Sequence, residues 1–131
     1  MRGDARTGYG GVVWDGAHWH LSFSPELFFK LADGEVRVRP MKGTAPRGQT
    51  GDEDARFKAG LAASTKDRAE NLMIVDLLRN DLGACCEPGS IQADPLFELR
   101  RFSNVQHLVS TVTGTLRRDL SPLDALLGAF P

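Results

Sequence analysis

A lysine beside a glycine is the first residue in this sequence whose surroundings could support chemistry. Lys42 stands in the segment RVRPMKGTAPRG, residues 37–48, with Gly43 after it and a proline on either side. A lysine is a nucleophile only when its amine is neutral, which requires desolvation or a nearby cation that lowers its pKa. Most lysines are instead solvated cations. This segment alone leaves both interpretations of Lys42 open.

A glutamate and a histidine are further candidates for chemistry. Glu26 follows Pro25 at the end of the run HLSFS, where a carboxyl group at a strand edge could act as a general acid or could simply face solvent. His107 lies in the strand-like run VQHLVSTV. A histidine at such a position is either a core side chain with satisfied hydrogen bonds or a catalytic group, and the sequence does not decide between the two.

Glu70 is a carboxylate within an apolar helical pattern. Met73, Ile74 and Leu77 are its i+3, i+4 and i+7 neighbours, and the other apolar residues cover most of the helix circumference. We therefore expect this helix to be buried nearly all round. A buried carboxylate must be paired, protonated or bound to a metal. Glu70 therefore either lies near enough to the helix start to reach solvent or to pair with Arg68 or a strand residue, or it is a ligand of a hard cation such as Mg²⁺.

The elements that must position these residues follow from the sequence pattern. Two short strands around Asp15-Gly16 and a second hairpin over residues 26–40 come first, with Pro40 ending a strand and opening a loop that carries Lys42. Helices are predicted over residues 52–64 and from Lys66 to a left-handed end at Gly83. Residues 89–117 return to strand composition, and Ser121 caps a final helix. This order predicts an α+β layered fold.

Composition excludes several classes of function. The 131 residues include 16 basic and 17 acidic side chains, and a formal charge of −1 is not the strong basic field that nucleic acid binding requires. No stretch is apolar for the length needed to span a membrane, and no apolar leader begins the chain. The two cysteines are adjacent, which suits neither a normal disulfide nor a zinc site. We therefore expect reduced thiols and a cytoplasmic location.

Four longer segments together resemble a known family. The runs SFSPELFFKL, RPMKGTAPRG, KDRAENLMIVDLLRNDLG and VQHLVSTVTG are similar, in order and spacing, to the motifs of the chorismate-utilising enzymes. This family includes component I of anthranilate synthase and of aminodeoxychorismate synthase, and the isochorismate and salicylate synthases. The resemblance covers roughly residues 9 to 131. It implies part of a layered α/β sandwich with antiparallel strands and two central helices.

The resemblance also implies a branch of the family and two catalytic residues. A lysine in the Pro-x-Lys-Gly-Thr segment is typical of aminodeoxychorismate synthases, whereas anthranilate synthases usually have alanine there, so Lys42 favours the first branch. Lys42 would attack the chorismate ring as the C4 hydroxyl leaves. Glu26 would protonate that hydroxyl, and ammonia would then displace the lysine.

Four more residues receive roles from the same resemblance. Gly43 and Thr44 would bind the substrate through a backbone N–H and a hydroxyl. His107 would line the ring pocket and orient the C4 oxygen. Glu70 would be one ligand of a Mg²⁺ ion that neutralises the ring carboxylate of chorismate.

The expected function is therefore that of an aminodeoxychorismate synthase component I fragment. It would convert chorismate and ammonia to 4-amino-4-deoxychorismate for 4-aminobenzoate and folate synthesis, with a glutamine amidotransferase supplying the ammonia. We interpret residues 1–131 as a partial chorismate-binding domain, truncated at both ends and inactive alone. The alternatives are an anthranilate synthase component I, an isochorismate or salicylate synthase relative, or a non-catalytic remnant that binds an anion through Arg39, Lys42 and Arg47.

Overall fold

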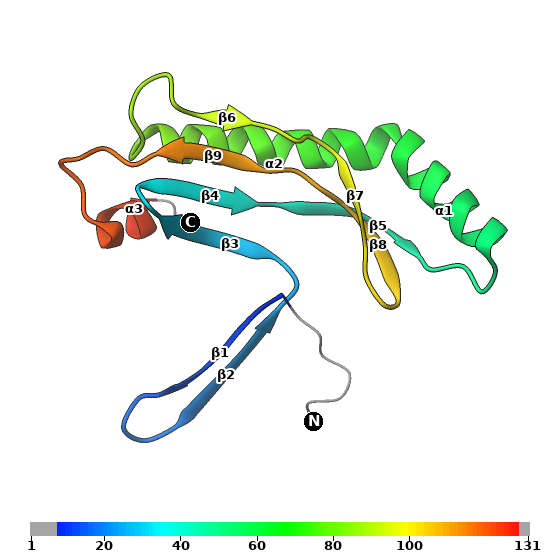
Figure 1. The fold of residues 1–131 in the computed structure, drawn as a ribbon, viewed down its shortest axis with the longest axis horizontal. Coiled ribbons are helices and arrows are strands. Elements are labelled where there is room, and N and C mark those ends of the chain that lie inside the picture. The colour runs from blue at the N-terminus through cyan, green and yellow to red at the C-terminus, as the bar shows by residue number, and fades with distance from the viewer. Residues whose placement is uncertain (1–7, 129–131) are drawn as a thin grey trace.

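A computed structural model describes residues 8–128 of the chain (Figure 1). Residues 1–7 and 129–131, which include the two ends interpreted above as truncated, lie outside the described part. The elements, in chain order, are β1 (Tyr9–Trp14), β2 (Trp19–Ser24), β3 (Leu27–Ala32), β4 (Glu35–Arg39), β5 (Met41–Pro46), α1 (Gly51–Ala63), α2 (Thr65–Gly83), β6 (Gln92–Ala93), β7 (Glu98–Arg101), β8 (Val105–Val109), β9 (Val112–Thr115) and α3 (Pro122–Gly128).

Both predicted hairpins are present. β1 and β2 pair around a turn in which Gly16 has a φ of 102°, a conformation that glycine adopts without strain. β3 and β4 pair around Asp33 and Gly34, whose φ values of 52° and 78° fit the tight turn that joins antiparallel strands. The β1–β2 hairpin projects away from the rest of the molecule (Figure 1).

Two further antiparallel sheets form the body. One has the strand order β3-β4-β9-β6, and the other has the order β5-β8-β7. β4 leads into β5 through Pro40 alone, so β5 carries Lys42 directly from one sheet into the other. The prediction that Pro40 opens a loop around Lys42 is therefore wrong, because residues 41–46 pair with β8.

The helices begin as the sequence predicts. Thr50 accepts a hydrogen bond from the Glu53 N–H and Glu53 reaches back to the Thr50 N–H, a capping box that starts α1. Ser64 caps α2 through the Asp67 N–H. The end of α2 differs from the prediction, because Gly83 is its last helical residue and is not among the glycines with positive φ.

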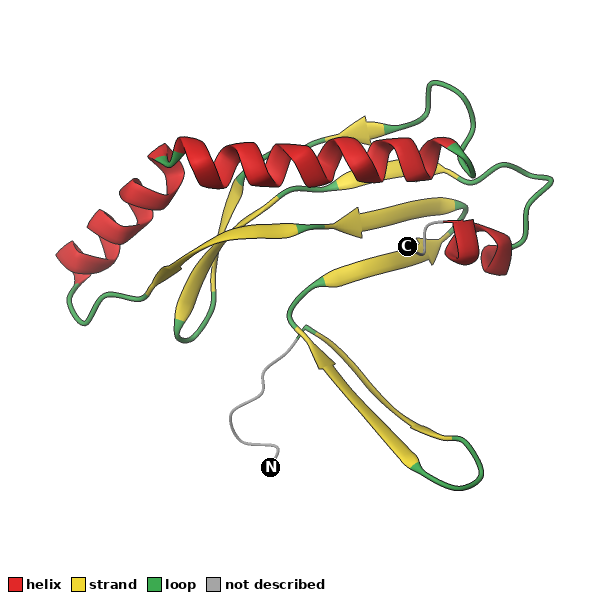
Figure 2. Ribbon diagram, turned by 180° about the vertical axis from the view of Figure 1, so that it is seen from behind, coloured by secondary structure: helices red, strands yellow, loops and turns green. Residues whose placement is uncertain are grey.

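α2 lies across one face of the body and α1 continues from it at an angle (Figure 2). The larger core lies between α2, α3 and the four-stranded sheet, and it includes Val36, Val38, Val75, Leu82 and Val112, all at most 1% exposed. A smaller core joins α1 to the three-stranded sheet around Ala45, Leu61 and Leu108. The chain is thus an α+β fold of antiparallel sheets covered by helices.

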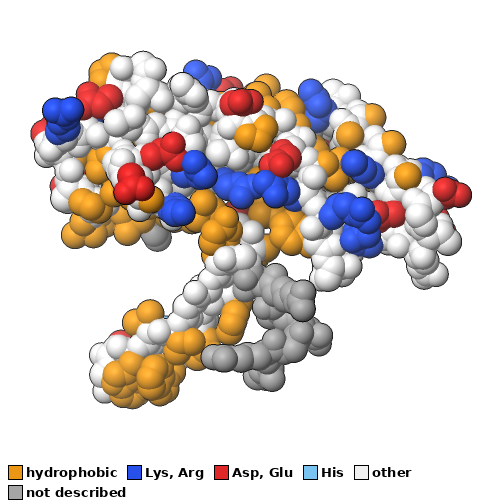
Figure 3. Space-filling view, viewed as in Figure 1, with side chains coloured by type: hydrophobic (Ala, Val, Ile, Leu, Met, Phe, Trp, Pro, Cys, Tyr) orange, Lys and Arg blue, Asp and Glu red, His pale blue; other side chains and the backbone are white. Residues whose placement is uncertain are grey.

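Large apolar side chains remain exposed in several regions, of which α2 and the projecting hairpin carry the most. Leu72, Met73 and Leu77 on α2 are 42%, 64% and 55% exposed, so the expectation that this helix is buried nearly all round is wrong. The projecting hairpin also carries apolar side chains over its surface (Figure 3). No helix within residues 8–128 combines the length and the apolar content needed to cross a bilayer.

Candidate functional site

β5 and its neighbours contain most of the predicted site residues. Lys42, Gly43 and Thr44 lie on this strand, which forms an outer edge of the three-stranded sheet and packs against both α1 and α2. The strand is short and follows Pro40 directly, so the backbone around Lys42 is held by pairing with β8. A strand is a more rigid support for a reacting side chain than the loop that we predicted.

Gly43 interrupts the regular pairing of β5. Its φ is +81°, and the register between β5 and β8 shifts at this residue. A Cβ atom here would lie 2.8 Å from the Cβ of Asp67 and 3.2 Å from the Cδ1 of Leu61. Glycine is therefore required both by the backbone angle and by the close approach of the helices. This local packing explains the residue without a substrate, and the predicted substrate contact through Gly43 stays a prediction.

Thr44 and His107 meet across the β5–β8 ladder. His107 Nδ1 lies 3.0 Å from Thr44 Oγ1 and 3.3 Å from the Gly43 carbonyl oxygen. A carbonyl oxygen only accepts hydrogen bonds, so the contact favours the tautomer in which Nδ1 carries the proton and Nε2 is an acceptor. The ring also makes an edge contact with Phe102 at a centroid distance of 5.5 Å. The Nδ1 atom of His107 thus has its hydrogen-bond partners within the protein.

Glu26 contacts the backbone of β5 one residue before Lys42. Its Oε1 accepts a hydrogen bond of 2.8 Å from the backbone N–H of Met41, the residue that precedes Lys42. Glu26 also lines a cavity of about 250 Å³ together with Pro40 and Ile74 of α2. Its side chain is exposed within the described part of the chain.

Glu70 is exposed on α2. Its side chain is 47% exposed, and its one ion pair is a loose one of 3.9 Å to Lys66. Glu70 therefore reaches solvent, which is one of the interpretations that the sequence left open, and the buried stripe of α2 is formed by Asn71, Val75 and Leu82.

The contacts made by the sequence neighbours of Glu70 indicate which side of α2 this residue lies on. Asp67, three residues before Glu70, packs on Gly43, and Ile74, four residues after it, lines the cavity with Glu26. Residues at i, i+3 and i+7 of a helix share a face, so Glu70 lies on the side of α2 that borders β5. Glu26, Lys42 and Glu70 therefore belong to one region of the molecule.

Thr44 and His107 form a second group. Directly paired residues of antiparallel strands point to the same face of a sheet. Lys42 pairs with Leu108, whereas Thr44 pairs with His107. The register shift at Gly43 thus places Lys42 on the helix side and Thr44 with His107 on the opposite side. The six predicted residues therefore fall into two groups on either side of Gly43, and the contacts made directly between them are those of His107 with Thr44 and Gly43.

The described residues do not form a complete set of metal ligands. Among residues 8–128, no three His, Cys, Asp or Glu side chains are grouped so that they could hold a metal ion. Mg²⁺ is usually bound by one or two carboxylates together with water and substrate oxygens. Glu70 fits the role of one such carboxylate.

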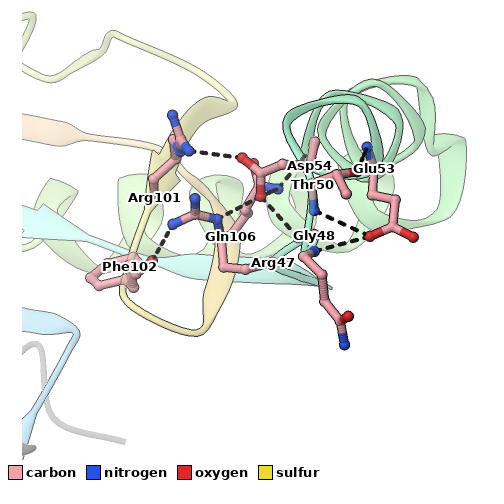
Figure 4. Close-up of polar contacts among 9 residues, drawn as sticks. Arg47, Gly48, Thr50, Glu53, Asp54, Arg101, Phe102 and Gln106 are labelled. Carbon is pink, nitrogen blue, oxygen red and sulfur yellow. Dashed lines mark hydrogen bonds and ion pairs between the residues drawn. The ribbon is translucent and has the colours of Figure 1, made fainter.

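Sequence analysis did not identify a polar cluster at the start of α1. Asp54 accepts hydrogen bonds from Arg47 at 2.6 Å, Arg101 at 2.8 Å, Gln106 at 3.2 Å and the Gly48 N–H at 3.1 Å (Figure 4). Its partners are up to 52 residues away in the sequence. An acidic residue in a first helical turn is common for local reasons, so no sequence signal distinguished Asp54 from its neighbours.

Comparison with known proteins identifies the family. The profile of a family described as chorismate binding enzyme matches residues 6–131. The chain belongs to this family. It is 54% identical over 112 residues to an aminodeoxychorismate synthase of Streptomyces griseus, a match that covers 85% of this chain and 16% of the relative. It is 52% identical over 111 residues to aminodeoxychorismate synthase component 1 of Klebsiella aerogenes, covering 85% of this chain and 25% of that protein.

A solved structure supports the fold of this family member. Anthranilate synthase component I from Streptococcus pneumoniae superposes with a TM-score of 0.81 and 31% sequence identity, over 95% of this chain and 26% of that one. The chain therefore spans about a quarter or less of the length of the relatives it matches. The resemblance recognised in the four sequence motifs is confirmed.

Proposed function

We propose that this chain forms the lysine-bearing part of an aminodeoxychorismate synthase, which converts chorismate and ammonia to 4-amino-4-deoxychorismate. The observation that carries the proposal is the hydrogen bond of 2.8 Å from the Met41 N–H to the Glu26 carboxylate, since it ties the Glu26 side chain to the residue that precedes Lys42. Relatives named as aminodeoxychorismate synthases are up to 54% identical to this chain over the aligned residues.

The proposed reaction has two displacement steps. The lone pair of a neutral Lys42 amine forms an N–C bond to the ring while the bond from C4 to the hydroxyl oxygen breaks, and Glu26 gives a proton so that water leaves. Ammonia then forms the new C–N bond as the bond to Lys42 breaks, which restores the neutral lysine amine, and a proton from the new ammonium group returns to Glu26. Both steps are substitutions, so no oxidant or reductant is needed.

Glu70 is proposed as one ligand of the magnesium ion that such a reaction would use. When bound, Mg²⁺ would neutralise the ring carboxylate of chorismate and so favour addition of a nucleophile. Glu70 suits this role because it is exposed, weakly paired and on the side of α2 that borders β5. We assign Thr44 and His107 to the part of the substrate that extends past Gly43, where the Nε2 atom of His107 can accept a hydrogen bond.

The proposed reaction places the protein in the route to 4-aminobenzoate and folate. The ammonia would come from a glutamine amidotransferase domain or subunit. We propose a cytoplasmic location, in keeping with two free and buried cysteines.

The proposal can be tested in a chimera. The chain would replace the matching segment, 111 residues long, of the Klebsiella aerogenes protein, and aminodeoxychorismate and anthranilate would be measured with chorismate, ammonia and Mg²⁺ supplied. Aminodeoxychorismate should be the product, and Lys42→Ala should lower its rate by about 100-fold or more. Lys30→Ala, an exposed lysine on β3, is the matched control and should have little effect.

Two results would overturn the proposal. If Lys42→Ala formed aminodeoxychorismate at the rate of the unmodified chimera, the nucleophile would lie elsewhere. If the unmodified chimera produced mainly anthranilate, the chain would belong to the other branch of the family, as the structural similarity to the Streptococcus pneumoniae protein allows.

A further inference from the structure

A fully buried polar pair lies at the junction of α2, β8, β5 and β7. Asn71 and Ser110 are both 0% exposed, and the Ser110 hydroxyl donates a hydrogen bond of 2.5 Å to Asn71 Oδ1. Burial of polar groups is unfavourable unless they are hydrogen-bonded, and an apolar pair of similar size is often as stable. A serine and an asparagine at the centre of the fold therefore require another explanation than stability alone.

The hydrogen bonds of this pair reach the segments that hold the proposed site. The side-chain amide of Asn71 donates to the Leu108 carbonyl at 3.2 Å, and Leu108 follows His107. Asn71 itself follows Glu70. The Ser110 N–H donates to the Pro40 carbonyl at 3.1 Å, two residues before Lys42. Three of the proposed site residues thus lie within two positions of a residue in this network.

The network also fixes the start of β7. The Ser110 hydroxyl oxygen accepts a hydrogen bond of 3.0 Å from the Phe97 N–H. Phe97 has a φ of 56°, and its ring lies under the guanidinium group of Arg68 on α2 at 4.3 Å. The strand that pairs with β8 and the helix that carries Glu70 are therefore joined at the same point. One buried pair links both neighbouring groups of site residues.

We infer that Asn71 and Ser110 are positioning residues, which hold the Glu70 helix in register with the strands that carry Lys42 and His107. This inference rests on the proposed function. Neither residue needs to touch the substrate. A displacement of about 1 Å between reacting groups can lower a rate by as much as 100-fold, so loss of the pair should reduce turnover more than it reduces substrate binding.

The test compares Ser110→Ala with a matched core variant in the chimera. Ser110→Ala should lower kcat by about 10- to 100-fold, with KM for chorismate changed by less than about threefold. Val75→Ala, at a 1% exposed position one turn along α2, removes apolar packing but no hydrogen bond. Assayed well below its Tm, this control should keep the kcat of the unmodified chimera even though it is destabilised.

Two milder variants show whether the hydroxyl is the important group. Ser110→Thr keeps the hydroxyl group, so the hydrogen bond to Asn71 can still form. Its kcat should lie within about threefold of that of the unmodified chimera. Ser110→Cys has nearly the volume of serine but a weaker hydrogen-bond donor, so its kcat should lie between those of Ser110→Ala and the unmodified chimera. This variant replaces Ser110→Thr if the larger threonine prevents folding. Tm would be measured for every variant.

The outcomes separate this inference from the proposed function. The inference is overturned if Ser110→Ala or Ser110→Cys keeps the kcat of the unmodified chimera, or if Val75→Ala loses as much kcat as Ser110→Ala at the same loss of Tm. An unmodified chimera that makes no aminodeoxychorismate would instead overturn the proposed function, and this inference with it.

Discussion

Asp54 is the residue with the densest set of polar contacts in the described part of the chain. The hydrogen bond from Arg47 holds the pKa of its carboxyl below the ordinary value, and the Gly48 N–H and the charge of Arg101 act in the same direction against the effect of burial. The carboxylate joins α1 to β8 and β7. It contributes to the fold and not to the proposed chemistry.

The lowered pKa of Asp54 predicts a specific dependence of stability on pH. A carboxyl group with a lower pKa in the folded state stabilises the fold above the unfolded pKa of about 3.9. That contribution is lost as the pH falls through the folded value. Thermal unfolding between pH 3 and pH 7 should show Tm falling below about pH 4. Asp54→Asn should lower Tm at pH 7 and reduce this dependence, whereas the exposed Asp76→Asn should do neither.

At the scale of elements, Gly43 makes the approach of β5 to the helices possible. Gly43→Ala should cost about 1–3 kcal/mol in the free energy of unfolding, since alanine is strained at positive φ and its Cβ would contact Asp67. Gly60→Ala is the control, because Gly60 lies within α1 with open space around it. Gly60→Ala should increase the free energy of unfolding by about 0.5–1 kcal/mol. Urea unfolding would show both, and a Gly43→Ala variant as stable as the parent would contradict the assigned packing.

The sequence predicts the helices and hairpins of this fold better than it predicts which face of each element is buried. Turn residues such as Asp33 and Gly34 act locally, so both hairpins are confirmed. α2 has apolar residues nearly all round, and periodicity alone could not show that the stripe of Asn71, Val75 and Leu82 is buried while Met73 is not. The strand around Lys42 was also missed, because its partner β8 lies more than 60 residues away.

In the candidate site, too, local motifs could be recognised from the sequence, whereas contacts between distant segments could not. The family resemblance singled out Lys42, Glu26 and Glu70, and the contacts of their sequence neighbours lie along β5 and the adjacent face of α2. It could not predict that the register shift at Gly43 separates Thr44 and His107 from them. Nor could it predict the role of Ser110, since a buried hydrogen bond depends on contacts between distant segments.

For the whole molecule, the most unusual feature is the apolar face of the β1–β2 hairpin. Direct pairing puts Val12 opposite Leu21 and Trp14 opposite Trp19 on one face. These four side chains are 49% to 64% exposed. A two-stranded hairpin is at best marginally stable by itself, so the hairpin contributes little to the stability of the body.

The small contribution of the hairpin to the stability of the body can be measured by replacing leucine with threonine at two positions, one in the hairpin and one at the core. Leu21→Thr on the exposed hairpin should change the free energy of unfolding by less than about 0.5 kcal/mol, and it should reduce binding of an apolar dye. Leu31→Thr, at a partly buried position packed on the larger core, should cost about 2 kcal/mol. Equal losses from the two variants in urea unfolding would show that the hairpin is part of the cooperative core.

The most direct test of the lysine chemistry is to trap the bond to Lys42. The chimera would be incubated with chorismate and Mg²⁺ without ammonia, then digested and mapped by mass spectrometry. The peptide that contains Lys42 should gain the mass of chorismate less one water, and addition of ammonia should remove that mass as aminodeoxychorismate appears. An unmodified Lys42 in an enzyme that still forms aminodeoxychorismate when ammonia is added would contradict a covalent role for this residue.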